Sequence, residues 1–199
     1  MNMSISKLVV NDFLRKKFSK SQINVLLFYA QFWKDPIEIC RLVGWAIGPD
    51  KKTQCHQKRI TLEAKGKLEK HLLSIYHQIP TLKDFEELMK LIRIKGIKGI
   101  GGLTVYDTAE RIGYAFGLYP TKVYLHRGTR TGAINLLGRK AVRGRKYLYM
   151  HEFPVEFQIL TPREMENCLC IYKDTFLTGK LPKQKLACNG KMIEMKNAC

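Results

Sequence analysis

The sequence predicts an all-α protein with a short irregular basic insert, and three observations carry that prediction. Apolar residues recur at helical spacing over several segments, for example at Leu68, Leu72 and Ile75. Residues 161–164 join a threonine, a proline and a glutamate in the order typical of a helix start. A Gly-x-Gly sequence that begins at Gly99 lies between two amphipathic segments, as in a tight turn between helices.

The same patterns place the elements in order along the chain. Helices end at the breakers Gly48-Pro49-Asp50 and Pro80, and a basic charge run over 139–146 leads into an extended piece over 147–150. We expect one helical domain over 1–177, with a helix-hairpin-helix core at about 81–138, and a flexible basic tail over 178–199. The expected helices are 4–18, 21–33, 36–47, 62–78, 129–137 and 161–172, with a basic loop over 51–60 and a turn from 120 into the helix at 129. Around the hairpin we expect a helix capped by 81–84 that carries Phe85, Leu88, Leu91 and Ile92 on one face, and a second helix that starts at about Gly102 and covers 104–116.

Composition restricts the partners more than the fold. The 199 residues are 45% hydrophobic, enough for a packed core, and their net charge of +18 favours a polyanion. We find no apolar run of membrane-spanning length and no signal-peptide pattern. The six cysteines include no Cys-x-x-Cys pair. We therefore expect reduced thiols, no metal, no cofactor, no membrane partner, no obligate protein partner, and a cytoplasmic protein that is nucleoid-associated when bound to DNA.

The segment 97–107 predicts a hairpin that binds phosphate. A Gly-x-Gly turn lets the backbone take a positive φ and come close to a ligand. The helix that begins at about Gly102 has N–H groups without intrahelical partners at the positive end of its dipole, and such groups bind anions. An ordinary turn between packed helices is the alternative. The candidate nucleic-acid-binding residues are Lys98, Gly99, Ile100, Gly101, Gly102, Thr104, Arg127, Arg130, Arg143 and Arg145.

Further candidates lie in the second half of the chain. Arg127 and Arg130 stand at a helix start and suit bidentate phosphate contact. The charge run that contains Arg143 and Arg145 predicts either a clamp on the nucleic-acid backbone or a solvated arm. Three tyrosines could stack on unpaired bases, with core packing as the alternative: Tyr147, Tyr149 and Tyr172.

Four motifs between residue 98 and about residue 137 carry a resemblance: Lys98-Gly99-Ile100-Gly101, Ala115-Phe116-Gly117, Pro120-Thr121 and Val123-Tyr124-Leu125-His126. In this stretch the chain resembles the helix-hairpin-helix DNA glycosylases of the endonuclease III type. The first motif is similar to the family's hairpin, and the three later motifs are similar to the segment that follows it. The resemblance implies a helical scaffold that binds DNA. A second resemblance, to a widespread group of uncharacterised bacterial proteins, brings no known activity and rests on the strings at 56–60, 104–109, 123–126 and 128–130.

The chain departs from the glycosylases at the positions that carry their chemistry. Tyr124 stands where the family has its catalytic aspartate, and Leu103 stands where bifunctional members have their lysine. A phenol with a pKa near 10 does not replace a carboxylate at neutral pH. Asp107 is the nearest spare carboxylate and His126 could act as a general acid or base. For both, the alternative is a structural role, Asp107 bonding to Thr104, Tyr106 or an arginine.

These observations predict sequence-independent DNA binding through a helix-hairpin-helix phosphate clamp, in DNA repair or a mobile-element context. The first alternative is a divergent DNA glycosylase or lyase that acts on damaged bases and uses Asp107, His126 or Tyr124. The second alternative is binding of structured RNA. The missing aspartate and lysine favour a protein that is not an enzyme.

Overall fold

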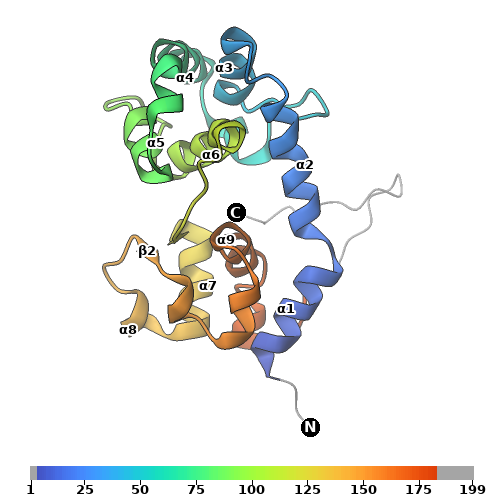
Figure 1. The fold of residues 1–199 in the computed structure, drawn as a ribbon. Coiled ribbons are helices and arrows are strands. Elements are labelled where there is room, and N and C mark those ends of the chain that lie inside the picture. The colour runs from blue at the N-terminus through green and yellow to red at the C-terminus, as the bar shows by residue number, and fades with distance from the viewer. Residues whose placement is uncertain (1–3, 183–199) are drawn as a thin grey trace. The chain divides into compact units, whose positions relative to one another are not determined.

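A computed structural model describes residues 4–182 of the chain, and these residues are mostly helical (Figure 1). Their contacts divide the chain into two compact units. Unit 1 comprises the residues up to Ser19 and those from Thr121 onward, and unit 2 comprises Lys20–Pro120. The stretch expected to form one domain thus falls into two units, and the expected hairpin core, 81–138, is divided between them after Pro120. Most of the predicted basic tail, from residue 183, lies outside the described residues.

Unit 2 is built from five helices and three short 3₁₀ turns. Local signals set several of its helix starts: Asp35, Thr61 and Asp84 each accept the backbone N–H three residues later. The helices are α2 (Phe18–Ala30, in unit 2 from Lys20), α3 (Pro36–Gly44), α4 (Leu62–Ile75), α5 (Phe85–Ile92) and α6 (Gly102–Gly113), and the turns are η1 (Cys55–Arg59), η2 (Tyr76–Thr81) and η3 (Tyr114–Phe116).

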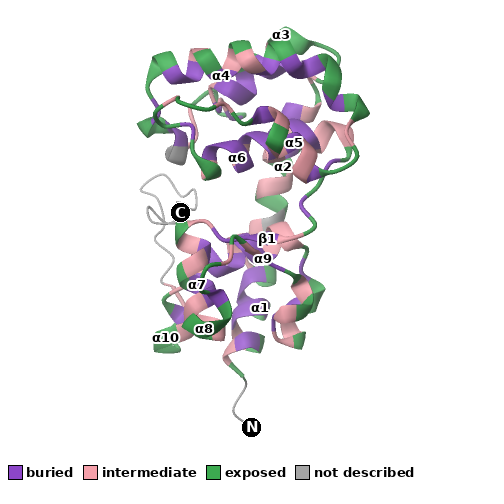
Figure 2. Cartoon of the chain, turned by 90° about the vertical axis from the view of Figure 1, so that its left-hand side faces the viewer, coloured by how far each residue is buried: buried purple, intermediate pink, exposed green. Residues whose placement is uncertain are grey.

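The core of unit 2 lies where α3 packs against α4 and α6, and where α5 packs against α6. The buried stripe predicted on α4 is present, with Leu68 and Leu72 at 2% and 0% exposure. The purple faces of these helices in Figure 2 turn inward together. Helix α6 thus packs against both α3 and α5, so the turn before α6 is anchored by the core.

Unit 1 joins the first helix to the second half of the chain. A hydrogen bond from the Tyr172 hydroxyl to Asp12 Oδ2 at 2.8 Å links the two parts in its core. Its elements are α1 (Ile5–Arg15), β1 (Val123–Tyr124), α7 (Arg127–Leu137), α8 (Arg139–Val142), β2 (Tyr147–Leu148), η4 (Met150–Glu152), η5 (Val155–Ile159), α9 (Pro162–Ile171) and α10 (Thr175–Thr178).

Several details of unit 1 differ from the sequence prediction. Part of the expected turn after residue 120 is a strand, since β1 pairs antiparallel with β2 through Val123–Leu148 and Tyr124–Tyr147. The charge run is not a free arm, because residues 139–142 form α8 and Val142 is fully buried. Cys168 and, in unit 2, Cys40 are free buried thiols. Within residues 4–182, no helix combines the length and apolarity needed to cross a bilayer.

Candidate nucleic-acid interface

The predicted hairpin is the connection between α5 and α6. Helix α5 ends at Ile92 and α6 begins at Gly102, so residues 93–101 form the turn. Gly99 has φ +93°, in the left-handed region that favours glycine. Gly101 has φ −99° and ψ −172°, an extended conformation that any residue adopts. The helix start at Gly102 and the positive φ of Gly99 agree with the sequence prediction.

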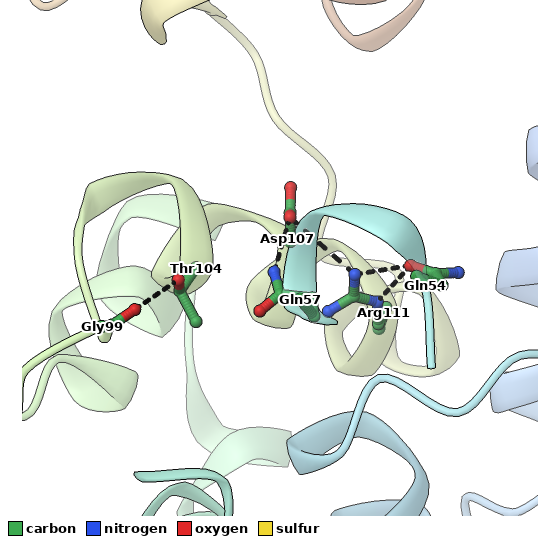
Figure 3. A network of polar contacts seen from close by, with 6 residues as sticks. All are labelled: Gln54, Gln57, Gly99, Thr104, Asp107 and Arg111. Atoms are coloured by element: carbon green, nitrogen blue, oxygen red, sulfur yellow. Dashed lines mark hydrogen bonds and ion pairs between the residues drawn. The ribbon is translucent and has the colours of Figure 1, made fainter. Parts of the chain in front are cut away.

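Two contacts hold this turn in place. The Thr104 hydroxyl donates to the carbonyl oxygen of Gly99 at 3.0 Å (Figure 3). Ile100 is 8% exposed and packs into the core of unit 2. On the other side, a Cβ placed on Gly99 would lie 3.6 Å from Ile60 Cγ2, so the turn runs alongside the end of η1. The backbone of the turn is therefore fixed before any ligand arrives.

The first turn of α6 is open to an incoming group. Its N-cap residue, Gly101, has no side chain to cap the helix, and the first intrahelical bond runs from Val105 N to Gly101 O at 3.0 Å. The N–H groups of residues 102–104 therefore have no partner within the helix. A Cβ on Gly101 or Gly102 would meet no atom within 4 Å. An anion can reach these donors without displacing protein atoms.

The surroundings of this helix start are basic. No acidic residue occurs from position 93 to position 106. The turn contributes three exposed cations, and η1, which adjoins Gly99 through Ile60, contributes two more. We call this set, together with the first turn of α6, the hairpin surface; its cations are Lys58, Arg59, Arg93, Lys95 and Lys98. The sequence marked Gln57 and Arg59 as a possible DNA-strand contact or a solvated loop, but it gave no sign that this segment lies beside the hairpin, because the contact joins segments about forty residues apart.

Behind the hairpin surface, a polar network joins η1 to α6 (Figure 3). Gln57 Nε2 donates to Asp107 Oδ2 at 2.8 Å, and Arg111 NH2 lies 3.8 Å from the same oxygen. Arg111 also donates twice to Gln54 Oε1, at 3.2 and 2.6 Å. The side chain of Arg111 is only 5% exposed, so Asp107 supplies the countercharge that a buried guanidinium needs. The only sequence signal for this network is the i,i+4 spacing of Asp107 and Arg111.

Two hydroxyls buried in unit 2 have no hydrogen-bond partner within the described residues: Tyr29 Oη and Thr108 Oγ1. Burial raises the pKa of Tyr29, the charge of nearby Arg111 lowers it, and Asp107 raises it again. The net result is a pKa above the ordinary value, so Tyr29 stays neutral and supplies no charge to the network. Sequence analysis singled out neither hydroxyl.

The four predicted arginines of unit 1 have different roles. Arg130 donates to the carbonyl oxygens of Val142 and Arg145, so it ties α7 to the charge run rather than pointing outward. Arg145 makes a bidentate ion pair with Glu152, with bonds of 2.5 and 2.7 Å. Arg127 and Arg143 are exposed. Lys98, in contrast, belongs to unit 2.

The three candidate catalytic residues lie in different units. Tyr124 and His126 lie together in unit 1, with ring centroids 6.5 Å apart and planes inclined by 16°. Asp107 belongs to unit 2, where it bonds to Gln57 and faces Arg111, as in the structural alternative of an acid that pairs with an arginine. Tyr172, a stacking candidate, is fully buried and bonds to Asp12, so core packing holds for this tyrosine.

Comparisons with known proteins match nothing to this chain: no family model fits it, and neither a curated protein nor a solved structure matches significantly. The function must therefore be argued from the geometry of the chain itself.

Proposed function

We propose that this protein binds DNA without sequence specificity and that the hairpin surface of unit 2 holds a phosphate of the DNA backbone. One observation carries the proposal: the N-terminus of α6 is uncapped, sterically open at Gly101 and Gly102, and adjoined by exposed cations, with no acidic residue from position 93 to position 106. A helix start of this kind favours an anion through its N–H groups and its dipole. The net charge of +18 adds a field that attracts a polyanion.

Each part of the surface has a defined task in this proposal. The N–H groups of residues 102–104 donate to the phosphate oxygens, while Lys98 neutralises the charge from the turn. Lys58 and Arg59 contact neighbouring phosphates. Because none of these contacts reaches a base edge, the surface positions DNA but reads no sequence. Selectivity would come from the shape or deformability of the DNA.

A proline at position 102 tests the backbone donor itself. Gly102→Pro removes one N–H group, while proline is well accepted at the first helical position and Gly101 already has the extended backbone that precedes proline. Gly102→Ala is the matched control, since it adds a Cβ in open space and keeps the N–H. We expect Gly102→Pro to weaken duplex binding about tenfold, the loss of one charge-assisted hydrogen bond of about 1.4 kcal/mol. Fluorescence anisotropy with a labelled duplex measures it, and equal affinities of the two folded variants would reject the hairpin as the contact.

Two lysine substitutions test the electrostatic contribution of the hairpin surface. Lys98→Ala should weaken duplex binding and reduce the slope of log K against log salt by about one phosphate contact. Lys70→Ala removes the same charge from an exposed position of α4 and should leave the slope nearly unchanged. A slope that falls equally in both variants would mean that net charge alone, and not the hairpin surface, accounts for binding.

Two additions to the same assay address the alternatives. Structured RNA that competes with duplex DNA at matched salt, and binds more tightly, would move the proposal to RNA. A denaturing gel on damaged and abasic duplexes detects base release or strand scission. Intact strands across the panel speak against a glycosylase or lyase, whereas cleavage that Asp107→Asn abolishes in a folded protein would favour one.

A further inference from the structure

A row of five aromatic rings runs through the β1–β2 ribbon of unit 1 and the segments that directly follow its two strands. Tyr124 lies opposite Tyr147 in the strand register, and their ring centroids are 6.3 Å apart. From Tyr124 the row continues to His126 at 6.5 Å, and from Tyr147 it continues to Tyr149 and then His151, each step 5.6 Å. We call these five residues the aromatic row.

The alternation of side chains along an extended backbone produces this row. Of the residues between its members, Leu148 is fully buried, Leu125 is 6% exposed, and Met150 is partly buried against the core of unit 1. The core of unit 1 is therefore supplied by the inner side of the ribbon. Exposure increases along the row, from 9% at Tyr124 to 39% at Tyr149, and His151 is also exposed. The row therefore begins at a buried tyrosine and reaches solvent at Tyr147, Tyr149 and His151, and this exposed end points to a ligand with flat apolar faces.

The stretch of sequence from residue 111 to residue 151, which contains the row, carries only basic charges. No acidic residue occurs between Glu110 and Glu152. Lys122 Nζ lies 4.8 Å from the centroid of the Tyr147 ring, and Arg143 and Lys146 are exposed just before β2. The occupant should therefore combine flat rings with negative charge.

The charge of Glu152 is balanced by Arg145, and Glu152 fixes the backbone at the end of the row. Both of its oxygens accept bonds from Arg145, and one also accepts the backbone N–H of Tyr149 at 2.8 Å. The Arg145 guanidinium holds the pKa of Glu152 below its usual range, against the effect of burial. Tyr149, the most exposed tyrosine of the row, thus has a backbone that is already held in place.

We propose that the aromatic row binds an unpaired DNA strand, with bases stacking on Tyr149 and Tyr147 and phosphates against Arg143, Lys146 and Lys122. This inference rests on the proposed DNA-binding function and specifies the strand state of the substrate. Every base has a face on which an aromatic ring can stack, but only an unpaired base exposes it, so the row favours single strands without reading sequence. The hairpin surface, in contrast, uses phosphates that a duplex also offers.

The test measures anisotropy with a labelled single-stranded thymidine 20-mer and with a labelled duplex. Tyr149→Ala should weaken single-strand binding by between five- and a hundredfold, the range for one lost stacking partner, and leave duplex binding within twofold. Tyr149→Phe keeps the ring and should bind like the wild type. Tyr119→Ala removes a more exposed tyrosine of unit 2 that is not part of the row, and should change neither affinity. Far-UV circular dichroism checks the folding of each variant.

Three outcomes would overturn the inference. If Tyr149→Ala binds the single strand as tightly as the wild type while Gly102→Pro still weakens duplex binding, the row is not a site although the proposed function stands. If wild-type protein binds neither oligonucleotide at low salt, the proposed function fails and the row fails with it. If a uridine 20-mer of RNA binds more tightly than its DNA counterpart, with the same dependence on Tyr149, the occupant is RNA and not DNA.

Discussion

Replacing Gly132 with alanine should break the packing of α7 against α9. A Cβ built on Gly132 would lie 2.1 Å from the carbonyl oxygen of Leu169 and 2.7 Å from its carbonyl carbon, whereas ordinary contacts begin at 3.4 Å. The obstacle is backbone, so no rotamer change can relieve it and the helices must separate by about 1 Å. Separation would also strain the buried hydrogen bond from Thr129 to Glu166 in the same interface. Overpacking of this kind costs about 1–3 kcal/mol, and the weakened buried hydrogen bond adds about 1 kcal/mol or more.

The expected loss of unfolding free energy is therefore about 3 kcal/mol, which lowers the melting temperature of a unit of this size by roughly 10 °C or more. Urea unfolding followed by far-UV circular dichroism reports both units. Tryptophan fluorescence reports unit 2 alone, since Trp33 and Trp45 both lie there. Gly132→Ala should shift the dichroism transition. A tryptophan transition that moves with it would show that the two units unfold together, as the single domain expected from the sequence requires.

Gly66→Ala is the matched control, because a Cβ on this glycine of α4 meets nothing within 4 Å and alanine favours the helix by about 1 kcal/mol. It should raise the tryptophan midpoint. A Gly132→Ala protein within about 0.5 kcal/mol of the wild type would refute the reasoning, since it would mean that α7 and α9 do not approach as closely as the structure has them.

Three further changes have defined outcomes. Burial alone would raise the pKa of Asp12, but hydrogen bonds from Lys16, Arg15 and Tyr172 outweigh burial, and the pKa is lowered. The Asp12 carboxylate therefore stabilises the fold at pH values above its unfolded pKa near 4, and this stabilisation is lost as the pH falls. Asp12→Asn should accordingly cost more stability at pH 7 than at pH 3, and an equal cost at both would contradict the linkage. Thr104→Val removes the hydrogen bond to Gly99 and should lower the unfolding free energy by about 1 kcal/mol. Thr108→Val, one turn later, replaces a buried hydroxyl that has no partner within the described residues, and it should be neutral or stabilising. Thermal melts in which both substitutions lower stability equally would reject this distinction. Asp107→Asn keeps an acceptor for Gln57 but removes the countercharge of Arg111, so tryptophan-monitored unfolding should show a loss of about 1–3 kcal/mol, and no loss would mean that the ion pair at 3.8 Å is inert.

Elements with strong local signals were predictable from the sequence. Thr161 caps α9 and forms a capping box with Glu164, as the residue order indicated. Gly102 begins α6, and Gly99 has the positive φ that its place in the turn requires. In each case the residues that set the helix start or the turn lie close together in the sequence, so a short sequence window carries the signal.

The remaining features depend on contacts between distant segments. Tyr172 bonds to Asp12 across 160 positions, and this pairing places the first helix in the same unit as the second half of the chain. Strand β1 has only two residues, too few to show alternation, and it is defined by its partner β2. The position of η1 beside the hairpin likewise follows from Gln57 and Ile60 meeting α6 and Gly99. No local pattern encodes such pairings.

The network around Asp107 changes how the candidate site should be interpreted. A carboxylate that bonds to Gln57 and balances a buried arginine already has a structural role, and it also fixes η1 against α6. Because Ile60 at the end of η1 lies against Gly99, the network supports the backbone of the turn from behind. If the protein binds DNA as proposed, a change at Asp107 should weaken binding by displacing Lys58, Arg59 and the turn, without any chemistry at the carboxylate. Loss of function on Asp107→Asn counts as catalysis only when duplex affinity and unit 2 stability are both retained.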